Sequence, residues 1–190
     1  MKVIETALAG VKVYQPARHR DDRGYFSEWY NARVLAAAGL DRQFVQDNVV
    51  LSQRPGTIRG LHFQIPPHAQ AKLIGVLRGS AFDVAVDIRA GSPTFGRSVV
   101  VELSAELGNQ IYIPEGFAHG ICNRDPDTIV AYKVTDYYDT ACDKGIAWND
   151  PDLAIAWPLG PEGPHLSERD RRLPRLAELY PPPFRYQEAR

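Results

Sequence analysis

The sequence has few cysteines and no long apolar run. Its 190 residues include only Cys122 and Cys142, which form no CxxC pair. This spacing matches neither a zinc-binding motif nor the disulfide framework of a small secreted protein. Charged residues interrupt the N-terminal segment 1–15, and no segment approaches the roughly 18 apolar residues of a bilayer-spanning helix. We therefore expect an unprocessed chain that does not enter the membrane and lies in the reducing cytoplasm.

The sequence also lacks an excess of charge of either sign. Lys and Arg total 22 and Asp and Glu total 23, which gives a formal net charge of −1. A protein whose main partner is nucleic acid would carry a basic excess or a Lys/Arg stripe, and the sequence has neither. Hydrophobic residues make up 44% and charged residues 24%, as in an average globular domain. We expect one domain over residues 1–190, with a C-terminal extension from about residue 158, where Pro and Gly become frequent.

Short β-strands separated by turns are predicted for most of residues 44–138. Segments rich in Val, Ile, Phe and Tyr are broken by Gly and Pro about every ten residues. This pattern predicts an all-β jelly roll or small barrel with a few short helices. One helix is predicted from the N-cap Asn31 to Ala38, where Gly39 stops it. The expected strands are 44–51, 57–64, 71–77, 81–88, 98–103, 110–113 and 128–135.

Two motifs in these strands resemble those of the cupin superfamily. The second motif fits at every fixed position, which are Gly108, Pro114, Gly116, His119 and Asn123. The resemblance implies a cupin-type jelly-roll barrel.

The first cupin-like motif lacks most of the ligands that a metal would need. It has His62, but Gln64 replaces the second histidine and Lys72 lies near the position of the ligand glutamate. A divalent metal normally needs three or four protein ligands, and the motifs supply only His62 and His119 beside a cation. We therefore expect no metal and no cofactor, which disfavours a metal-dependent dioxygenase.

A narrower resemblance is carried by ordered motifs spread over residues 1–176. They include DRGYFSE at 22–28, QDN at 46–48, RGLHFQ at 59–64, QAKL at 70–73, YKVTD at 132–136 and SERD at 167–170. Together they resemble the dTDP-4-dehydrorhamnose 3,5-epimerase family. The resemblance implies a cofactor-independent isomerase that acts on a nucleotide-linked 4-keto-6-deoxy sugar.

The chemistry of such an epimerase explains four residue types. Inverting a carbon beside a ketone needs a base, a group that stabilises the enolate, and an acid on the opposite face. By resemblance, His62 is the base and Asp170 its partner. Lys72 would then face the developing O4 oxyanion, and Tyr132 would be the acid.

Each of these residues also has a purely structural interpretation. Taken alone, His62 is a histidine on a strand, Lys72 a solvated edge-strand lysine, and Tyr132 a buried core tyrosine. Asp170 follows Ser167 by three residues, which is the pattern of a capping box at the start of a helix.

The resemblance assigns the remaining site residues to substrate binding. Two arginines match positions that hold the diphosphate, for which a planar cation is suited. Other residues match positions that hold the nucleotide partly across a subunit interface, so the resemblance implies a homodimer. Asp143 and Arg169 stand where the family often has Glu and Lys. The expected substrate-binding residues are Arg23, Phe26, Glu28, Gln46, Asn48, Arg59, Asp83, His119, Tyr138, Asp143 and Arg169, with Asp83 and His119 forming a second polar cluster.

Strand geometry makes two further predictions about this pocket. Alternation along the strand that carries Tyr132 places Tyr138 on the same face. Arg59 and His62 are three positions apart and would point to opposite faces of a regular strand. Both line one pocket only if Gly60 or its neighbours bend the strand.

The sequence therefore predicts an epimerase that inverts C3 and C5 of a dTDP-4-keto-6-deoxy-hexose. Its partners would be that sugar nucleotide and a second copy of the chain, with no nucleic acid and no membrane. Three alternatives remain open: an epimerase acting at C3 or C5 only, a 3,4-ketoisomerase, and a catalytically silent sugar-nucleotide-binding cupin. The silent cupin predicts loss of the proton-transfer residues, but His62, Lys72, Tyr132 and Asp170 are all present.

Overall fold

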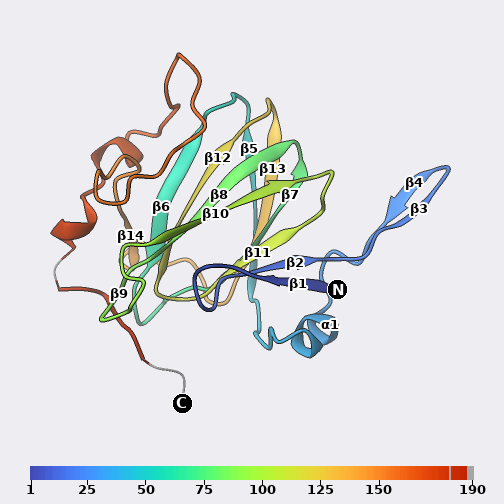
Figure 1. Cartoon of the computed structure of the whole chain (residues 1–190), viewed down its shortest axis with the longest axis horizontal. Coiled ribbons are helices and arrows are strands. Elements are labelled where there is room, and N and C mark those ends of the chain that lie inside the picture. The colour runs from blue at the N-terminus through green and yellow to red at the C-terminus, as the bar shows by residue number, and fades with distance from the viewer. Residues whose placement is uncertain (180, 188–190) are drawn as a thin grey trace.

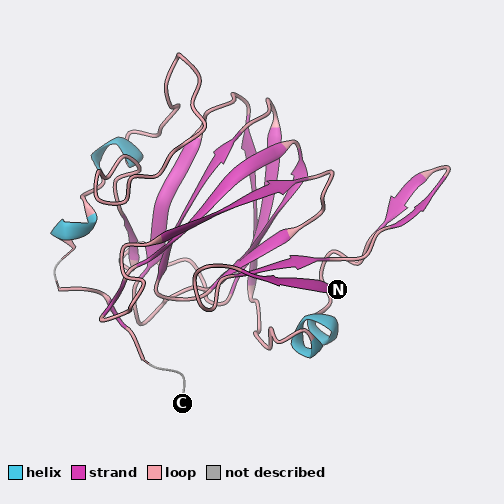
Figure 2. Ribbon diagram, viewed as in Figure 1, coloured by secondary structure: helices cyan, strands magenta, loops and turns pink. Residues whose placement is uncertain are grey.

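Two antiparallel β-sheets packed face to face form the body of the protein (Figures 1 and 2). The structure is a computed structural model that describes residues 1–179 and 181–187. Strands dominate these residues and the helices are short. This arrangement confirms the all-β jelly roll predicted from the sequence.

The larger sheet has six strands and the smaller sheet has five. In spatial order the larger sheet contains β1 (Lys2–Glu5), β2 (Lys12–Gln15), β11 (Gln110–Ile113), β7 (Lys72–Arg78), β13 (Thr128–Val134) and β5 (Gln46–Ser52). The smaller sheet contains β10 (Ser98–Ser104), β8 (Ser80–Asp87), β12 (Phe117–Asn123), β6 (Ile58–Gln64) and β14 (Asp143–Gly145). The other elements are the β3 (His19–Asp21) and β4 (Gly24–Phe26) hairpin, α1 (Ala32–Ala37), η1 (Asp170–Arg172), η2 (Leu176–Glu178), and the parallel pair β9 (Arg89–Ala90) and β15 (Phe184–Arg185).

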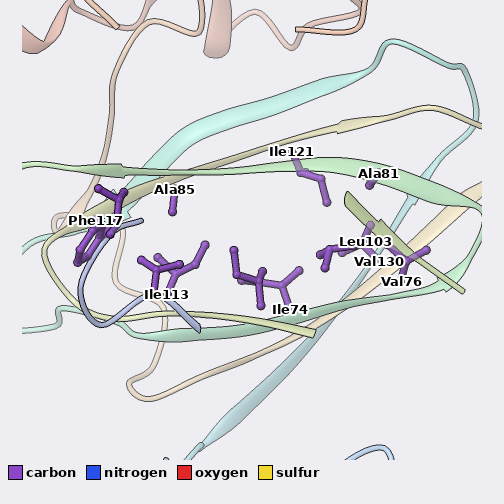
Figure 3. Close-up of a cluster of buried hydrophobic side chains, with 12 residues drawn as sticks. Ile74, Val76, Ala81, Ala85, Leu103, Ile113, Phe117, Ile121 and Val130 are labelled. Atoms are coloured by element: carbon purple, nitrogen blue, oxygen red, sulfur yellow. The ribbon is translucent and has the colours of Figure 1, made fainter. Parts of the chain in front are cut away.

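A hydrophobic cluster fills part of the space between the two sheets (Figure 3). The larger sheet contributes Ile74 and the smaller sheet contributes Ala85, both fully buried. Burying such side chains stabilises a fold by about 1.5–3 kcal/mol for each large aliphatic group. Ile121 and Val130 belong to this cluster and also line a cavity that contains polar residues. The apolar core therefore forms one wall of the candidate site.

The predicted helix is present on the outside of the larger sheet. The Asn31 side chain accepts hydrogen bonds from the backbone N–H groups of Arg33 and Val34, which caps α1 as expected. Leu35 is the buried residue of the helix and packs in a cluster with Tyr14 of β2. The chain turns away at Gly39, which has a φ of +84°.

The β3–β4 hairpin projects away from the two sheets (Figure 1). We call residues 19–26 the arm. Every residue of its two strands is exposed, including the Phe26 side chain, which is 67% exposed. The arm therefore has no hydrophobic packing of its own that would hold it against the body of the protein.

An irregularity in β6 brings Arg59 and His62 to one cavity. His119 of β12 pairs with His62 of β6, and Ile121 pairs with Arg59. An advance of two residues along β12 is therefore matched by three residues along β6. Gly60 lies between Arg59 and His62 and has a φ of +136°, a conformation that favours glycine. The condition set for a shared pocket is therefore met, because both side chains line the same cavity.

The strand that carries Tyr132 is shorter than predicted. β13 ends at Val134, so strand alternation does not extend to Tyr138. Tyr138 instead lies in the loop between β13 and β14, where its hydroxyl donates to Asp143 Oδ2 at 3.1 Å. Within the described residues, no helix is long and apolar enough to cross a membrane.

Substitution Gly60→Ala should destabilise the fold strongly. A Cβ at residue 60 would lie 2.5 Å from Gly120 Cα and 2.8 Å from the His119 carbonyl oxygen. Both atoms are backbone and cannot move aside without shifting β12, so we expect a loss of more than about 2 kcal/mol in the free energy of unfolding. Urea denaturation measures this loss.

Gly91→Ala provides the matched control. Gly91 has a φ of +83°, but nothing lies within 4 Å of its added Cβ. This substitution should therefore lower the free energy of unfolding by only about 1 kcal/mol, through backbone strain. Equal losses for the two variants would show that the contact with β12 is unimportant.

Candidate active site

His62 and Asp170 form a close pair between β6 and the C-terminal segment. His62 Nε2 lies 2.6 Å from Asp170 Oδ1, and the Asp170 side chain is only 4% exposed. Burial favours the neutral acid, but hydrogen bonds from His62 and Ser167 and the charge of Arg169 outweigh it and lower the pKa of Asp170. An ionised Asp170 accepts a hydrogen bond from Nε2–H, which leaves His62 Nδ1 with a free lone pair.

The local structure around Ser167 explains how Asp170 becomes available to His62. The Asp170 backbone N–H donates to Ser167 Oγ at 3.1 Å, as one half of a capping box requires. The Asp170 carboxylate bonds to His62 and not to the backbone at Ser167. Gly145 of β14 lies beside Leu173, and a Cβ at residue 145 would be 2.8 Å from Leu173 Cδ1. A glycine there allows the segment that follows η1 to pack closely against the smaller sheet.

Lys72 reaches across the interior from the first residue of β7. Its Nζ donates to the His62 carbonyl oxygen at 3.3 Å, which links the two sheets. Burial lowers the pKa of Lys72 to about 8, while the charges of Asp143 and Asp83 act in the opposite direction. The ammonium form therefore predominates at neutral pH, and a positive charge in a poorly hydrated cavity interacts strongly with a nearby oxyanion.

Tyr132 lies beside Lys72 in the larger sheet. β13 pairs with β7 so that Val134 is opposite Lys72 and Tyr132 opposite Ile74. Burial raises the pKa of Tyr132, the charge of Arg59 lowers it, and the charge of Asp143 raises it. The net upward shift keeps the phenol protonated at neutral pH, so Tyr132 can act as a proton donor.

His119 and Asp83 form the second polar pair that the sequence predicted. His119 Nε2 lies 2.9 Å from Asp83 Oδ2, and Asp83 is fully buried. The other carboxylate oxygen, Oδ1, has no hydrogen-bond partner among the described residues. In the register of the smaller sheet, His119 is directly opposite His62. The two histidines therefore occupy the same level of the barrel.

Two cavities meet at these residues. The Arg59 cavity has a volume of about 260 Å³ and the Tyr138 cavity about 250 Å³. The Arg59 cavity is lined by residues that include Ser52, Arg59, His62, Lys72, His119, Tyr132 and Asp170. The Tyr138 cavity is lined by residues that include Gln46, Asn48, His62, Gln70, Lys72, Tyr132, Tyr138, Asp143 and Arg169. His62, Lys72, Tyr132 and Arg169 line both cavities and thus stand at their junction.

Charged and polar groups surround the Tyr138 cavity. Arg169 Nη1 lies 2.7 Å from Asp143 Oδ2, which also accepts from the Tyr138 hydroxyl. Gln46 Nε2 donates to Asn48 Oδ1 at 2.9 Å along β5. These five residues, all expected in substrate binding, line the Tyr138 cavity, and Arg169 lines the Arg59 cavity as well.

Arg59 is the cationic residue that lines the Arg59 cavity alone, since Lys72 and Arg169 line both cavities. Its guanidinium donates to Ser52 Oγ at 3.3 Å and to the Leu51 carbonyl oxygen at 3.1 Å. These contacts orient the planar group along β5. Sequence reasoning did not identify Ser52, and no sequence signal separates it from other strand serines.

Gln64 has a structural role at the position of a metal ligand in other cupins. Its side-chain amide donates to the carbonyl oxygens of His68 and Tyr137, and its Oε1 accepts from the Asp139 backbone N–H. It thereby holds the loop that carries Tyr138. No group of three or more His, Cys, Asp or Glu side chains suited to a metal ion occurs in the part of the chain that the structure describes.

The structure does not bring Arg23, Phe26 or Glu28 to either cavity of the same chain. Arg23 and Phe26 lie in the arm, and Glu28 is the second residue after it. Arg23 pairs with Asp21 at 2.6 Å and is largely exposed. Glu28 Oε1 accepts from the Asn31 side chain at 3.1 Å.

A larger cavity lies away from the reacting groups. It measures about 570 Å³ and lies beside Gly56, Gly163 and His165. It contains none of the residues that the proton-transfer chemistry requires. Volume alone therefore does not identify the active site of this protein.

Comparison with known proteins identifies the family. The model of the dTDP-4-dehydrorhamnose 3,5-epimerase family matches residues 5–178. A protein of that name from Sinorhizobium fredii is 47% identical over 180 residues, which covers 95% of this chain and 91% of the relative.

Two crystal structures resemble the protein closely. The dTDP-4-dehydrorhamnose 3,5-epimerase from Bacillus anthracis, with TDP and pyrophosphate bound, is 50% identical, has a TM-score of 0.89 and covers 92% of this chain and 98% of its own. The dTDP-6-deoxy-D-glucose-3,5-epimerase from Legionella pneumophila, in complex with dTDP-4-keto-L-rhamnose, is 44% identical, has a TM-score of 0.92 and covers 98% of both chains. The chain therefore belongs to the dTDP-4-dehydrorhamnose 3,5-epimerase family.

Proposed function

We propose that the protein inverts C3 and C5 of dTDP-4-keto-6-deoxyglucose, with His62 as the base, Lys72 as the oxyanion partner and Tyr132 as the acid. The observation that carries this proposal is the position of these three residues, together with Arg169, at the junction of two cavities. An α-proton beside the C4 ketone is acidic enough for such a base only if the enolate is stabilised as it forms. Family membership makes the dTDP-linked sugar the expected substrate.

Proton removal begins at His62. The hydrogen bond to Asp170 at 2.6 Å fixes the ring and stabilises the imidazolium that forms. The His62 Nδ1 lone pair takes the proton from the carbon next to the ketone, and the electron pair moves to O4. Lys72 places its ammonium against the developing O4 oxyanion.

Reprotonation from the opposite face completes the inversion. The Tyr132 hydroxyl gives a proton to the same carbon, and the electron pair returns from O4 to restore the ketone. His62 then releases its proton to solvent and Tyr132 regains one from solvent, which restores both groups. Repeating the two steps at the other α-carbon inverts both C3 and C5. His119, held by Asp83, orients the sugar at the level of His62.

Arg59 and the residues around the Tyr138 cavity bind the nucleotide. Arg59 is suited to the diphosphate because a guanidinium can donate two parallel hydrogen bonds. Gln46, Asn48, Tyr138, Asp143 and Arg169 form the polar surface around the Tyr138 cavity and contact the substrate there.

A homodimer is part of the proposal, because three expected nucleotide-binding residues lie on or beside the arm. Arg23, Phe26 and Glu28 reach neither cavity of their own chain, so they act in the site of a second copy. The outer face of the larger sheet exposes apolar side chains, which favours burial against that copy. These side chains are Val49 at 68% exposure, Leu51 at 49% and Leu77 at 49%.

Two further features complete the proposal. Residues 1–190 form one epimerase domain with a C-terminal extension from about residue 158, although residue 180 and residues 188–190 lie outside those described. A cytoplasmic location is consistent with the free, buried thiols of Cys122 and Cys142. The proposal includes no metal, no cofactor, no nucleic acid and no membrane.

Substitution His62→Ala should lower kcat by at least about 10²-fold, because a positioned general base contributes 10² to 10⁴. Asp170→Asn should also lower kcat, since an amide cannot stabilise the imidazolium as a carboxylate does. Both variants should still bind TDP, which isothermal titration calorimetry measures. Turnover of the His62→Ala variant close to that of the unmodified protein would mean that another residue is the base.

The pH dependence of kcat/KM, which reports titrating groups of the free enzyme, should follow the charge of Lys72. The ammonium is needed and its pKa is lowered to about 8, so activity should fall as the pH rises through about 8. Substitution Asp143→Asn removes a charge that raises the pKa of Lys72. The alkaline fall should therefore move to lower pH in this variant. A profile that is flat from pH 7 to 10, or an unmoved fall in Asp143→Asn, would contradict the role of the Lys72 charge.

A further inference from the structure

The arm is joined to the body of the protein through one anchor residue on each side. Arg18 immediately precedes the arm, and Trp29 follows shortly after it. Between them, the Ser27 hydroxyl donates to the Ala17 carbonyl oxygen at 2.8 Å and closes the base of the hairpin. The contacts of Arg18 and Trp29 with the sheets therefore determine the direction in which the arm projects.

Arg18 binds the turn between β10 and β11. Its guanidinium donates to the carbonyl oxygens of Glu106 at 2.5 Å and Ala105 at 2.6 Å. A Cβ at Gly108 would collide with this guanidinium, so a glycine is required for the approach. The same guanidinium stacks on the ring of Tyr25 in the arm, with its central carbon 4.2 Å from the ring centre. Arg18 thus connects the arm directly to the body of the protein.

Trp29 lies against the outer face of the larger sheet. Its ring packs over Gly75 of β7, where an added Cβ would be 2.6 Å from two ring atoms. Its carbonyl oxygen accepts from Gln110 Nε2 at 2.7 Å, and Gln110 is a buried residue of β11. Gly75 is not in a left-handed conformation, so the close approach of the Trp29 ring is the reason that a glycine fits there.

These anchors compensate for the weakness of the arm itself. An isolated two-stranded hairpin is marginally stable in water, and every residue in the strands of the arm is exposed. Without Arg18 and Trp29 the arm would sample many directions. Glu28 is adjacent to Trp29 and is also held by Asn31. Fixing Trp29 therefore also fixes Glu28.

We propose that Arg18 and Trp29 are positioning residues that preorganise the arm for the substrate site of a second copy of the chain. They hold Arg23, Phe26 and Glu28 where these residues meet the nucleotide. The inference rests on the proposed function, because it takes the arm to act across a dimer. Preorganisation reduces the conformational entropy lost on binding, and the proton-transfer groups lie elsewhere. The anchors therefore act on KM and leave kcat nearly unchanged.

The first experiment measures kcat and KM for dTDP-4-keto-6-deoxyglucose in Trp29→Ala and Gly75→Ala. One variant removes the ring and the other displaces it. Each should raise KM about 10-fold and change kcat by less than about twofold. The double variant should be no worse than Trp29→Ala alone, because both substitutions remove the same contact. Trp29→Phe, which keeps a ring, should recover part of the loss.

Phe95→Ala is the matched control. Phe95 is an exposed aromatic residue outside the arm, and its removal should leave KM unchanged. Arg18→Ala tests the other anchor if a Gly75 or Trp29 variant does not fold. An unchanged KM in folded anchor variants, or a fall in kcat with no rise in KM, would overturn the proposal.

A second experiment separates the anchor from the proposed function. A Trp29→Ala chain is co-expressed with a His62→Ala chain under two affinity tags, and the mixed dimer is purified. Its one site with an intact base belongs to the Trp29→Ala chain and receives an intact arm from the His62→Ala chain. We expect this site to regain the KM of the unmodified protein. A KM that stays high would overturn action across the dimer, whereas absence of turnover in the unmodified protein would overturn the proposed function.

Discussion

The hydrogen bond between His62 and Asp170 is the interaction on which the active site depends. It joins a strand in the smaller sheet to a 3-10 turn that is 108 residues later in the sequence. The bond forms only if the C-terminal segment lies close to β6. Gly145 permits this approach by leaving room for Leu173, and Ser167 fixes the start of the turn through the Asp170 N–H. The C-terminal extension is thus part of the active site.

The space between the sheets combines two requirements that normally conflict. A hydrophobic cluster supplies stability, and a group of titratable residues lies against it. Burying charges is costly unless they are paired. The protein pairs His62 with Asp170 and His119 with Asp83. Lys72 has only a carbonyl contact among the described residues, and its lowered pKa reflects the cost. A cation that is incompletely paired is the group best able to interact with an oxyanion on the substrate.

Much of the fold was predictable from local patterns, whereas the site residues were predicted from the family resemblance. β11 was predicted with its correct bounds, because turns flank it on both sides, and α1 because Asn31 and Gly39 are strong signals. The prediction that the strand of Tyr132 extends to Tyr138 was wrong. The alternating sequence pattern continues beyond Val134, but the backbone pairing of β13 ends there.

Other features depend on contacts that are distant in the sequence. The sequence indicated only that Arg59 and His62 could share a pocket if the strand bends near Gly60. Whether it bends depends on how β6 pairs with β12. The roles of Gln64, Gly75 and Gly145 were not predictable, since each depends on a segment that packs against it from far along the chain. The separation of Arg23, Phe26 and Glu28 from their own cavity is likewise a property of the folded chain.

The most direct test of the account is proton NMR of dTDP-4-keto-6-deoxyglucose in deuterated water with the purified protein. If His62, Lys72 and Tyr132 form and reprotonate an enolate at both α-carbons, the C3 and C5 proton signals should both disappear as deuterium enters. Loss of only one signal would make the protein a single-carbon epimerase. Retention of both signals while the sugar nucleotide binds would contradict the proposed chemistry.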